Sequence, residues 1–328
     1  MSITITTGGI TMTGGGVSFT APPPSTPTAA WFAGGGGAVP SGAASIVQRI
    51  TYATDTATAT IRGPLDGVRY GQGATSDLNY GWYAGGRIGD ALSMVSRITY
   101  ATDTNTASNR GPISYSAWFI AATGNTTYGW YAGGQTTGPR VSTVSRITYA
   151  TDTATGTSRG LLSSTLSGMA ATGTTTDGWF GGGYQQVPSS IQLSRVSRIT
   201  YATDTDTPTV RGPLSLARER LAATGTPSYG WFAGGYQPGF FSRVDRIDYA
   251  NDTATASTRG PLSQANIGLA ASTDSTTYGW FGGGYKPPSP GWKSTVDRIT
   301  YATDTAIATV RGSLSASRSY LAATSGIQ

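Results

Sequence analysis

Six near-copies of one unit follow each other along this chain, and this repetition limits the fold more than any other feature. Each copy contains an aromatic core that ends in a glycine doublet, clearest in YGWFAGG at 229–235. The core tryptophan recurs about every 50 residues, at Trp31, Trp82, Trp130, Trp179, Trp231 and Trp280. A period of this length indicates one repeated supersecondary unit, and neighbouring units must pack together because none buries its own faces.

Each copy divides into four short strands. The first is Leu-Ala-Ala-Thr, the second Tyr-Gly-Trp-Phe-Ala, the third Val-x-Arg-Ile-x-Tyr, and the fourth Thr-Ala-Thr-Ala-Ser before a Gly-Pro pair. Between the third and fourth strands, Ala-Thr-Asp-Thr forms a turn whose aspartate we expect to bond its own backbone. No segment has a sustained apolar period of 3.6 residues, so we expect almost no helix.

Four-stranded units at this spacing predict an all-β protein, a six-bladed β-propeller. The small residues of the first strand suit the crowded axis, and the bulky aromatic and aliphatic residues belong between blades. The six tryptophans are therefore predicted to be structural.

The two ends of the repeat region predict how the ring closes. The last copy has a first strand at 321–324 and no second strand after it, whereas the first copy begins with a second strand at 30–33. The C-terminal strand is expected to complete the N-terminal blade, which leaves no free sheet edge inside the ring. The sequence thus predicts a propeller over residues 29–328.

The order of strands, doublet, loop and aspartate turn resembles the kelch repeat and is kept in all six copies. The doublets lie at Gly34/Gly35, Gly85/Gly86, Gly133/Gly134, Gly182/Gly183, Gly234/Gly235 and Gly283/Gly284. In one respect the chain departs from that family, whose last strand usually contains a tryptophan, whereas here it is rich in Thr and Ala. The Thr/Gly-rich repeats are also similar to propeller repeats in structural proteins of tailed phages of aquatic bacteria, a likeness that implies a virion protein.

Composition excludes several kinds of chemistry. The chain has no Cys and no His, so disulfides, thiolate nucleophiles, Cys/His zinc sites and histidine acid–base catalysis are excluded. Copper sites like those of some kelch-type oxidases need these residues too. Among the carboxylates no catalytic pair is indicated by spacing, and Glu219, between two arginines, is expected to form a solvated ion pair. We expect no enzyme activity, no cofactor and no metal site.

The net charge of +6 is a property of the repeat. Two arginines and one turn aspartate in each of six copies already account for it, so the charge is spread around the ring and nucleic-acid binding is not expected. The start of the chain lacks the basic residues and continuous apolar run of a secretory signal. No apolar run approaches the length of a membrane span.

The copies differ from one another mainly on one predicted face, which carries the loops after Gly-Gly and the connections between blades. Divergent loops on a uniform scaffold are typical of a recognition surface, although drift of unconstrained loops gives the same pattern. Aromatic and basic residues there are our predicted contacts for a cell-surface glycan or protein. They are Tyr184, Tyr236, Phe240, Phe241, Tyr285, Lys286, Trp292, Lys293, Arg87, Arg140, Trp118, Arg218, Arg220, Arg318 and Tyr320.

Residues 1–20 differ from the repeats and are read as two or three short strands separated by glycine turns. Such a segment cannot bury a core alone. We expect it to dock onto another protein by strand addition, with a disordered tail as the alternative. A Pro-rich linker is expected at 21–28. The docking residues would be Ile3, Ile5, Ile10, Met12, Val17 and Phe19.

Three kinds of function remain open. The first is a virion component of a tailed phage, a fibre, appendage or decoration, whose N-terminus docks to the particle and whose propeller contacts the host. The second is a subunit of an extracellular or cell-surface filament joined by N-terminal strand insertion. The third is an intracellular kelch-like scaffold for a protein partner.

Overall fold

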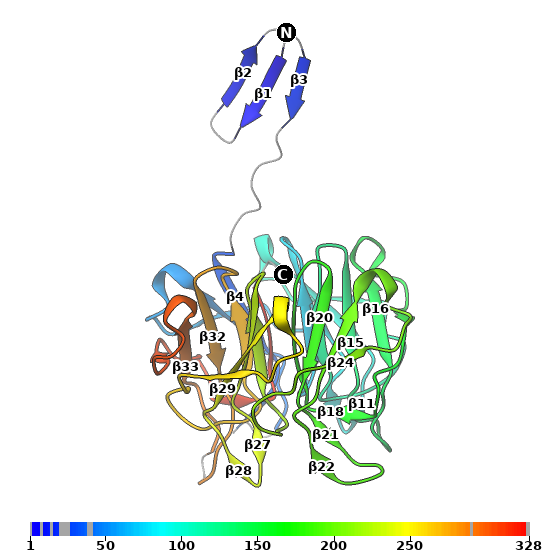
Figure 1. The fold of residues 1–328 in the computed structure, drawn as a ribbon. Helices are drawn as coiled ribbons and strands as arrows, with labels where there is room; N and C mark the ends of the chain where they lie inside the picture. The colour runs from blue at the N-terminus through cyan, green and yellow to red at the C-terminus, as the bar shows by residue number, and fades with distance from the viewer. Residues whose placement is uncertain are drawn as a thin grey trace.

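The computed structural model describes residues 27–37, 42–288 and 291–325, and the backbone of residues 2–6, 9–13 and 16–19. In these residues the protein is all-β, and its only helical pieces are short 3₁₀ turns. Four-stranded antiparallel sheets repeat along the chain (Figure 1). This architecture is consistent with a β-propeller.

The four-stranded sheets are numbered I to VI. Their strands, from the first to the fourth, are as follows: sheet I, β36 (Ala322–Thr324), β4 (Ala29–Ala33), β6 (Val47–Thr51) and β7 (Thr60–Arg62); sheet II, β8 (Gly73–Ser76), β9 (Tyr80–Ala84), β12 (Val95–Thr99) and β13 (Ser108–Arg110); sheet III, β14 (Ala121–Gly124), β15 (Tyr128–Ala132), β16 (Val144–Thr148) and β17 (Thr157–Ser158); sheet IV, β19 (Ala170–Gly173), β20 (Asp177–Gly181), β23 (Val196–Thr200) and β24 (Thr209–Arg211); sheet V, β25 (Ala222–Gly225), β26 (Tyr229–Ala233), β29 (Val244–Asp248) and β30 (Ser257–Arg259); sheet VI, β31 (Ala270–Thr273), β32 (Tyr278–Gly282), β33 (Val296–Thr300) and β34 (Thr309–Val310).

The first strands of the sheets lie against one another. β8 contacts β14, β14 contacts β19, β19 contacts β25, β25 contacts β31, β31 contacts β36, and β36 contacts β8. Strand β36, from the C-terminal end, pairs with β4, from the start of the repeats, with Ala323 opposite Phe32. Small residues fill these strands, as the crowding at their mutual contacts requires.

Two strand boundaries differ from the sequence prediction. The tyrosine expected to end the third strand instead begins a 3₁₀ turn, as in η5 (Tyr249–Asn251). The others are η1 (Tyr52–Thr54), η2 (Tyr100–Thr102), η3 (Tyr149–Thr151), η4 (Tyr201–Thr203) and η6 (Tyr301–Thr303). The fourth strand begins later than predicted, at Ser257 in sheet V, because the 3₁₀ turn and the bend after it use most of the Thr/Ala-rich stretch.

The core lies between sheets, as predicted for the bulky residues. One buried cluster joins Trp130 and Val144 of sheet III to Phe180 and Ile199 of sheet IV, and the other seams repeat this pattern. The glycine doublet turns the chain sharply after the second strand. Gly133 has φ +65°, and a Cβ there would lie 2.5 Å from the carbonyl oxygen of Leu166, so no other residue fits.

The divergent loops contain small strands of their own: β5 (Gly36–Gly37) with β35 (Arg318–Ser319), β10 (Arg87–Ile88) with β11 (Asp90–Ala91), β18 (Leu166–Ser167) with β21 (Tyr184–Gln185) and β22 (Ile191–Gln192), and β27 (Tyr236–Gln237) with β28 (Gly239–Phe240). Hairpins β21–β22 and β27–β28 project from one end of the molecule (Figure 1). The chain enters sheet I at the other end, where Ala29 pairs with Thr51 beside η1.

The N-terminal segment forms a separate sheet of β1 (Ser2–Thr6), β2 (Gly9–Thr13) and β3 (Gly16–Phe19), in the order β2-β1-β3. β1 is antiparallel to β2 and parallel to β3. The sequence prediction of two or three short strands is therefore confirmed. The side chains of the predicted docking residues lie outside the described part of the chain, as does most of the predicted linker.

Candidate functional site

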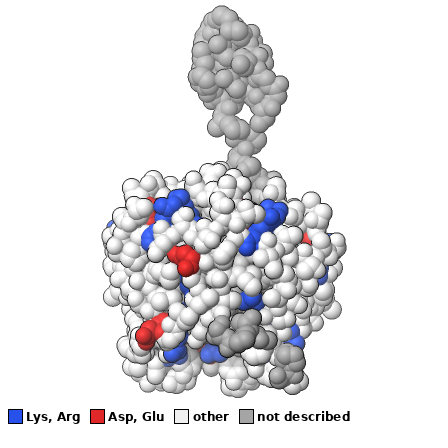
Figure 2. Space-filling view, turned by 180° about the vertical axis from the view of Figure 1, so that it is seen from behind, with Lys and Arg blue, Asp and Glu red and all other residues white. Residues whose placement is uncertain are grey.

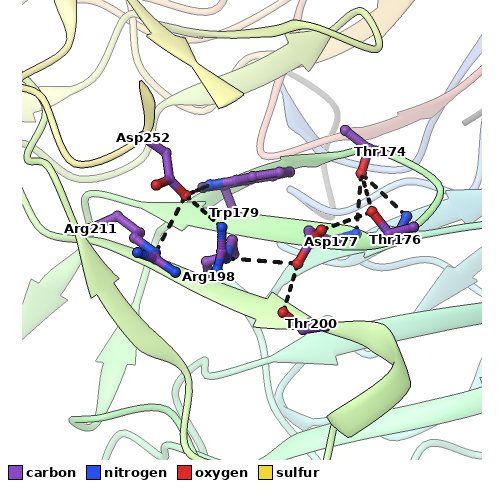
Figure 3. A network of polar contacts seen from close by, with 8 residues as sticks. All are labelled: Thr174, Thr176, Asp177, Trp179, Arg198, Thr200, Arg211 and Asp252. Atoms are coloured by element: carbon purple, nitrogen blue, oxygen red, sulfur yellow. Dashed lines mark hydrogen bonds and ion pairs between the residues drawn. The ribbon is translucent and has the colours of Figure 1, made fainter. Parts of the chain in front are cut away.

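The seams between neighbouring sheets carry one repeated polar network. In the seam of sheets IV and V (Figure 3), the Asp252 carboxylate accepts a 2.9 Å hydrogen bond from the indole nitrogen of Trp179. Arg198 and Arg211, from the same sheet as Trp179, lie 3.3 and 3.4 Å from the same oxygen. Equivalent groups join Asp103 to Trp31, Arg49 and Arg62; Asp152 to Trp82, Arg97 and Arg110; Asp204 to Trp130, Arg146 and Arg159; Asp304 to Trp231, Arg246 and Arg259; and Asp55 to Trp280, Arg298 and Arg311.

This network corrects the prediction for the turn aspartate. The carboxylate does not turn back to its own backbone, because the neighbouring sheet presents an indole N–H and two guanidinium groups to it. At Asp55, burial by itself favours the neutral acid, but hydrogen bonds from Arg311 and Trp280 outweigh it and hold the pKa below its usual value. The aspartate, tryptophan and two arginines are therefore structural groups of the repeat.

The tryptophan is also covered by a tyrosine of the next sheet. The Trp130 and Tyr201 rings stack with centroids 3.9 Å apart, and the Tyr201 hydroxyl bonds Thr123 of the first strand at 2.9 Å. The same stacking occurs in every seam. Each Trp therefore has its face and its N–H satisfied by frame residues, which supports the prediction that the tryptophans are structural.

Fully buried arginines lie between the connecting segments and the sheets. Arg218 donates to Asp245 at 2.8 Å and to the backbone oxygens of Gly234 and Phe232. Arg318 occupies the equivalent place beside sheet I, where Gln48 replaces the aspartate. Two of its guanidinium nitrogens have no hydrogen-bond partner among the described residues, and burial lowers its pKa.

Where the connecting segments meet the first strands, six residues form a closed circle of backbone hydrogen bonds. Each N–H donates to the carbonyl of the next member, over 2.6–2.9 Å, in the order Gly71, Tyr320, Gly268, Arg220, Gly168, Phe119 and back to Gly71. All six have φ between 55° and 72°. This left-handed conformation is uncommon for residues with a side chain, so Phe119, Arg220 and Tyr320 are held there under strain.

The three large residues of this circle meet one another and form what we call the axial plug: Phe119, Arg220 and Tyr320. The Phe119 and Tyr320 rings have centroids 5.1 Å apart. The Arg220 guanidinium donates to the Tyr320 hydroxyl at 3.0 Å and lies 5.4 Å from the Phe119 ring. At Gly268, between Arg220 and Tyr320 in the circle, a glycine is required because a Cβ there would lie 2.7 Å from the Tyr320 ring.

Two cavities lie along the first strands. The smaller, of about 130 Å³, is lined by the hydrogen-bonded circle and by apolar side chains such as Met169 and Leu221. The larger, of about 640 Å³, lies at the end of the first strands away from the circle and is lined mainly by Ala, Thr and Ser, including Thr174, Thr226 and Thr276. No charged residue lines the larger cavity, so it offers no electrostatic attraction for an ionic ligand.

Most predicted contact residues lie half-buried on the divergent loops, where several form pairs. Tyr236 and Phe240 pack edge to face across hairpin β27–β28, with centroids 5.5 Å apart. In sheet VI, Tyr285 and Trp292 do the same at 5.9 Å. Arg140 lies 4.3 Å from the Tyr184 ring centre. Phe241, Lys286 and Lys293 are half-buried in the same loops, as is Arg87 in its own loop.

Three of the predicted contact residues are buried and cannot contact a ligand at the surface. Trp118 is 5% exposed, Arg218 0% and Arg318 1%. Trp118 lies beneath Arg87, whose guanidinium is 4.5 Å from its ring, and Arg218 and Arg318 are buried between the connecting segments and the sheets. These three residues are therefore left out of the proposed contact surface.

The carboxylates also differ from expectation. Glu219 is buried rather than solvated, because it lies under Arg220, 3.5 Å away, and the amide of Gln192. In the described part of the chain, no three acidic residues lie close enough together to hold a metal ion. On the face drawn in Figure 2, basic residues lie scattered among uncharged ones and do not form one continuous patch.

Sequence reasoning missed the closed circle and the axial plug. One signal was available, because Phe119, Arg220 and Tyr320 occupy the position that is glycine in the other three copies. It also missed that the turn aspartate, already noted as present in every copy, meets the equally constant arginines.

A scan against protein-family models and a search of curated proteins gave no match for this chain. Within the described residues, no helix has the length and apolar character needed to cross a membrane.

Proposed function

We propose that sheets I to VI are the blades of a six-bladed, kelch-like propeller closed into a ring by its C-terminal strand. The proposal is supported by the contacts between neighbouring sheets, which lead from sheet I through all the others and back to sheet I. The first strands touch in a cycle through β36 and β8, and β36 pairs with β4. The seam of Asp55 with Trp280 joins sheets VI and I in the same way as all the others.

We further propose that this ring is a non-enzymatic structural or attachment protein of a tailed phage virion. The observation that carries the proposal is that the chain enters the sheets at one end of their strands and has its divergent loops at the other. The N-terminal segment enters sheet I beside the uniform 3₁₀ turns, whereas the divergent loops lie at the opposite end of the strands (Figure 1). A segment docked to a particle at one end leaves the divergent loops facing outward.

The outward face is proposed to bind a host-surface glycan or protein through aromatic and basic side chains. Half-buried rings such as Tyr285 and Trp292 present flat apolar surface that suits a sugar ring, and Lys286, Lys293 and Arg140 suit hydroxyl or anionic groups. Drifting loops need no such rings, and the pairing of Tyr236 with Phe240 holds one hairpin in a defined shape.

Binding is tested on a glycan array and on intact host cells. We expect the double variant Tyr285→Ala, Trp292→Ala to lose binding. A matched control removes two exposed apolar residues from the outer strands β7 and β24, Ile61→Ala and Val210→Ala, and should bind like the wild type. Equal binding by both double variants would exclude the aromatic loops as the contact surface.

The virion assignment is tested separately by removing residues 1–27. The truncated ring should fold but fail to enter particles. Electron micrographs of the native assembly distinguish the assignments, because a virion protein gives particles with appendages, a filament subunit gives continuous fibres, and a scaffold gives isolated discs.

A further inference from the structure

The N-terminal sheet divides its residues into two chemically different faces. Its register pairs Ile3 with Met12 and Val17, and Ile5 with Ile10 and Phe19. Residues paired across neighbouring strands share a face, as do residues two apart along a strand. One face therefore holds every apolar residue of these strands: Ile3, Ile5, Ile10, Met12, Val17 and Phe19. The other holds Thr4, Thr11, Thr13 and Ser18 among its positions.

An apolar face of this kind needs a cover. A small sheet is stable in water only when an apolar face is packed against something. Among the described strands, β1, β2 and β3 pair only with one another. Strand addition at the edges of β2 or β3 would satisfy backbone groups but would leave the apolar face exposed. The docking role proposed above therefore requires a second contact, made by the face.

We propose that the same face of a second copy of this chain covers it, so that two N-terminal sheets pack into a sandwich. Residues 2–19 contain no charged side chain, so electrostatic complementarity does not select a different partner. A face made only of Ile, Met, Val and Phe is complementary to itself. Two sheets packed about 10 Å apart form the smallest sandwich core, and twofold pairs are the commonest closed assembly.

The size of the face fits a modest but specific interface. Burying an apolar side chain fully contributes about 1.5–3 kcal/mol. At about 25 cal/mol per Å², this corresponds to about 60–120 Å² of surface removed from water. Six such residues from each of two chains remove about 700–1,400 Å², which reaches the lower limit for a specific interface. The association should therefore depend on protein concentration.

The test uses the full chain and measures mass by light scattering during size-exclusion chromatography across a range of micromolar concentrations. The wild type should approach twice the chain mass of 33.7 kDa as concentration rises. Ile5→Asp places a charge on the apolar face and should give 33.7 kDa throughout. Thr4→Asp places the same charge on the adjacent residue and the opposite face, and should behave like the wild type. Near-ultraviolet circular dichroism of the tryptophans should be identical in all three proteins.

Three results would overturn the inference: a wild type at 33.7 kDa throughout, an Ile5→Asp variant that still associates, or a Thr4→Asp variant that dissociates as well. A monomeric wild type that floats with lipid vesicles would assign the face to a membrane surface instead. The inference rests on the docking role of residues 1–20, yet the two can fail separately. Ile5→Asp protein that enters particles without self-association would retain the docking role and refute the sandwich.

Discussion

Replacing Asp204 by alanine tests whether the seam network holds neighbouring sheets together. The carboxylate accepts the Trp130 indole N–H at 2.8 Å and lies 3.0 and 3.4 Å from Arg146 and Arg159. Alanine removes all three contacts and leaves a buried indole N–H without an acceptor. Because the neighbouring sheets also pack through Trp130 and Tyr201, the fold should survive the change.

The expected loss follows from the burial of each partner. A hydrogen bond to a charged acceptor contributes about 1.5–3 kcal/mol when it is buried, as the Trp130 bond is. The arginine side chains are 18% and 20% exposed, so their ion pairs are partly screened by water and together add about 1 kcal/mol. We therefore expect Asp204→Ala to lower the free energy of unfolding by about 2.5–4 kcal/mol. Asp204→Asn keeps an acceptor and should cost about half as much.

The measurement is denaturant unfolding followed by tryptophan fluorescence, with the slope of the transition compared between proteins. Asp206→Ala is the control, because this exposed aspartate lies two residues away in the same turn and should change stability by less than about 0.5 kcal/mol. If Asp204→Ala matches Asp206→Ala within that margin, the seam carboxylate does not stabilise the fold and the argument fails.

Three further predictions concern buried charges. Because the pKa of Asp55 is below its usual 3.8, the contribution of its charge to the free energy of unfolding is complete above that pH and is lost as pH falls through the folded-state pKa. In Asp55→Asn, the free energy of unfolding should therefore fall less steeply between about pH 5 and about pH 2 than in the wild type. Burial raises the pKa of Asp297, so its charge opposes folding at neutral pH. Asp297→Asn should therefore raise the free energy of unfolding at pH 7, and the difference from the wild type should shrink as pH falls and Asp297 becomes protonated. Gln48→Asp, which copies Asp245, should pair the buried Arg318 and raise the thermal midpoint, and an unchanged or lower midpoint would contradict this.

Much of the architecture could be predicted because the six copies of the repeat could be compared with one another. Alternation in Val-x-Arg-Ile gave the third strand, and the small residues of Leu-Ala-Ala-Thr indicated a crowded position. Boundaries were less accurate. Tyr249 suits a strand by propensity, yet it leaves the strand early because its ring stacks on Trp179 of the adjacent sheet. A contact between two sheets therefore sets the end of the third strand, and the local sequence pattern does not reveal that contact.

The candidate site was harder to predict, because loop sequence shows divergence but not exposure. Arg218 and Arg220 are two residues apart, yet Arg218 is buried against sheet V, where it pairs with Asp245, whereas Arg220 belongs to the axial plug. Nothing in ARERL distinguishes them. Arg218 can be buried because it pairs with Asp245, which lies 27 residues further along the chain. An arginine is usually exposed unless it has such a partner.

The alternation of large residues and glycine around the hydrogen-bonded circle limits how the repeat number can change. Large members stand at every second position with a glycine on both sides, and a Cβ would lie 3.0 Å from the Phe119 ring at Gly71 and 2.7 Å from the Tyr320 ring at Gly268. Only an even number of members lets such an alternating order close on itself. Loss or gain of one repeat would place two large residues, or two glycines, side by side in the hydrogen-bonded circle, so a chain that keeps this alternating order changes its number of repeats in pairs.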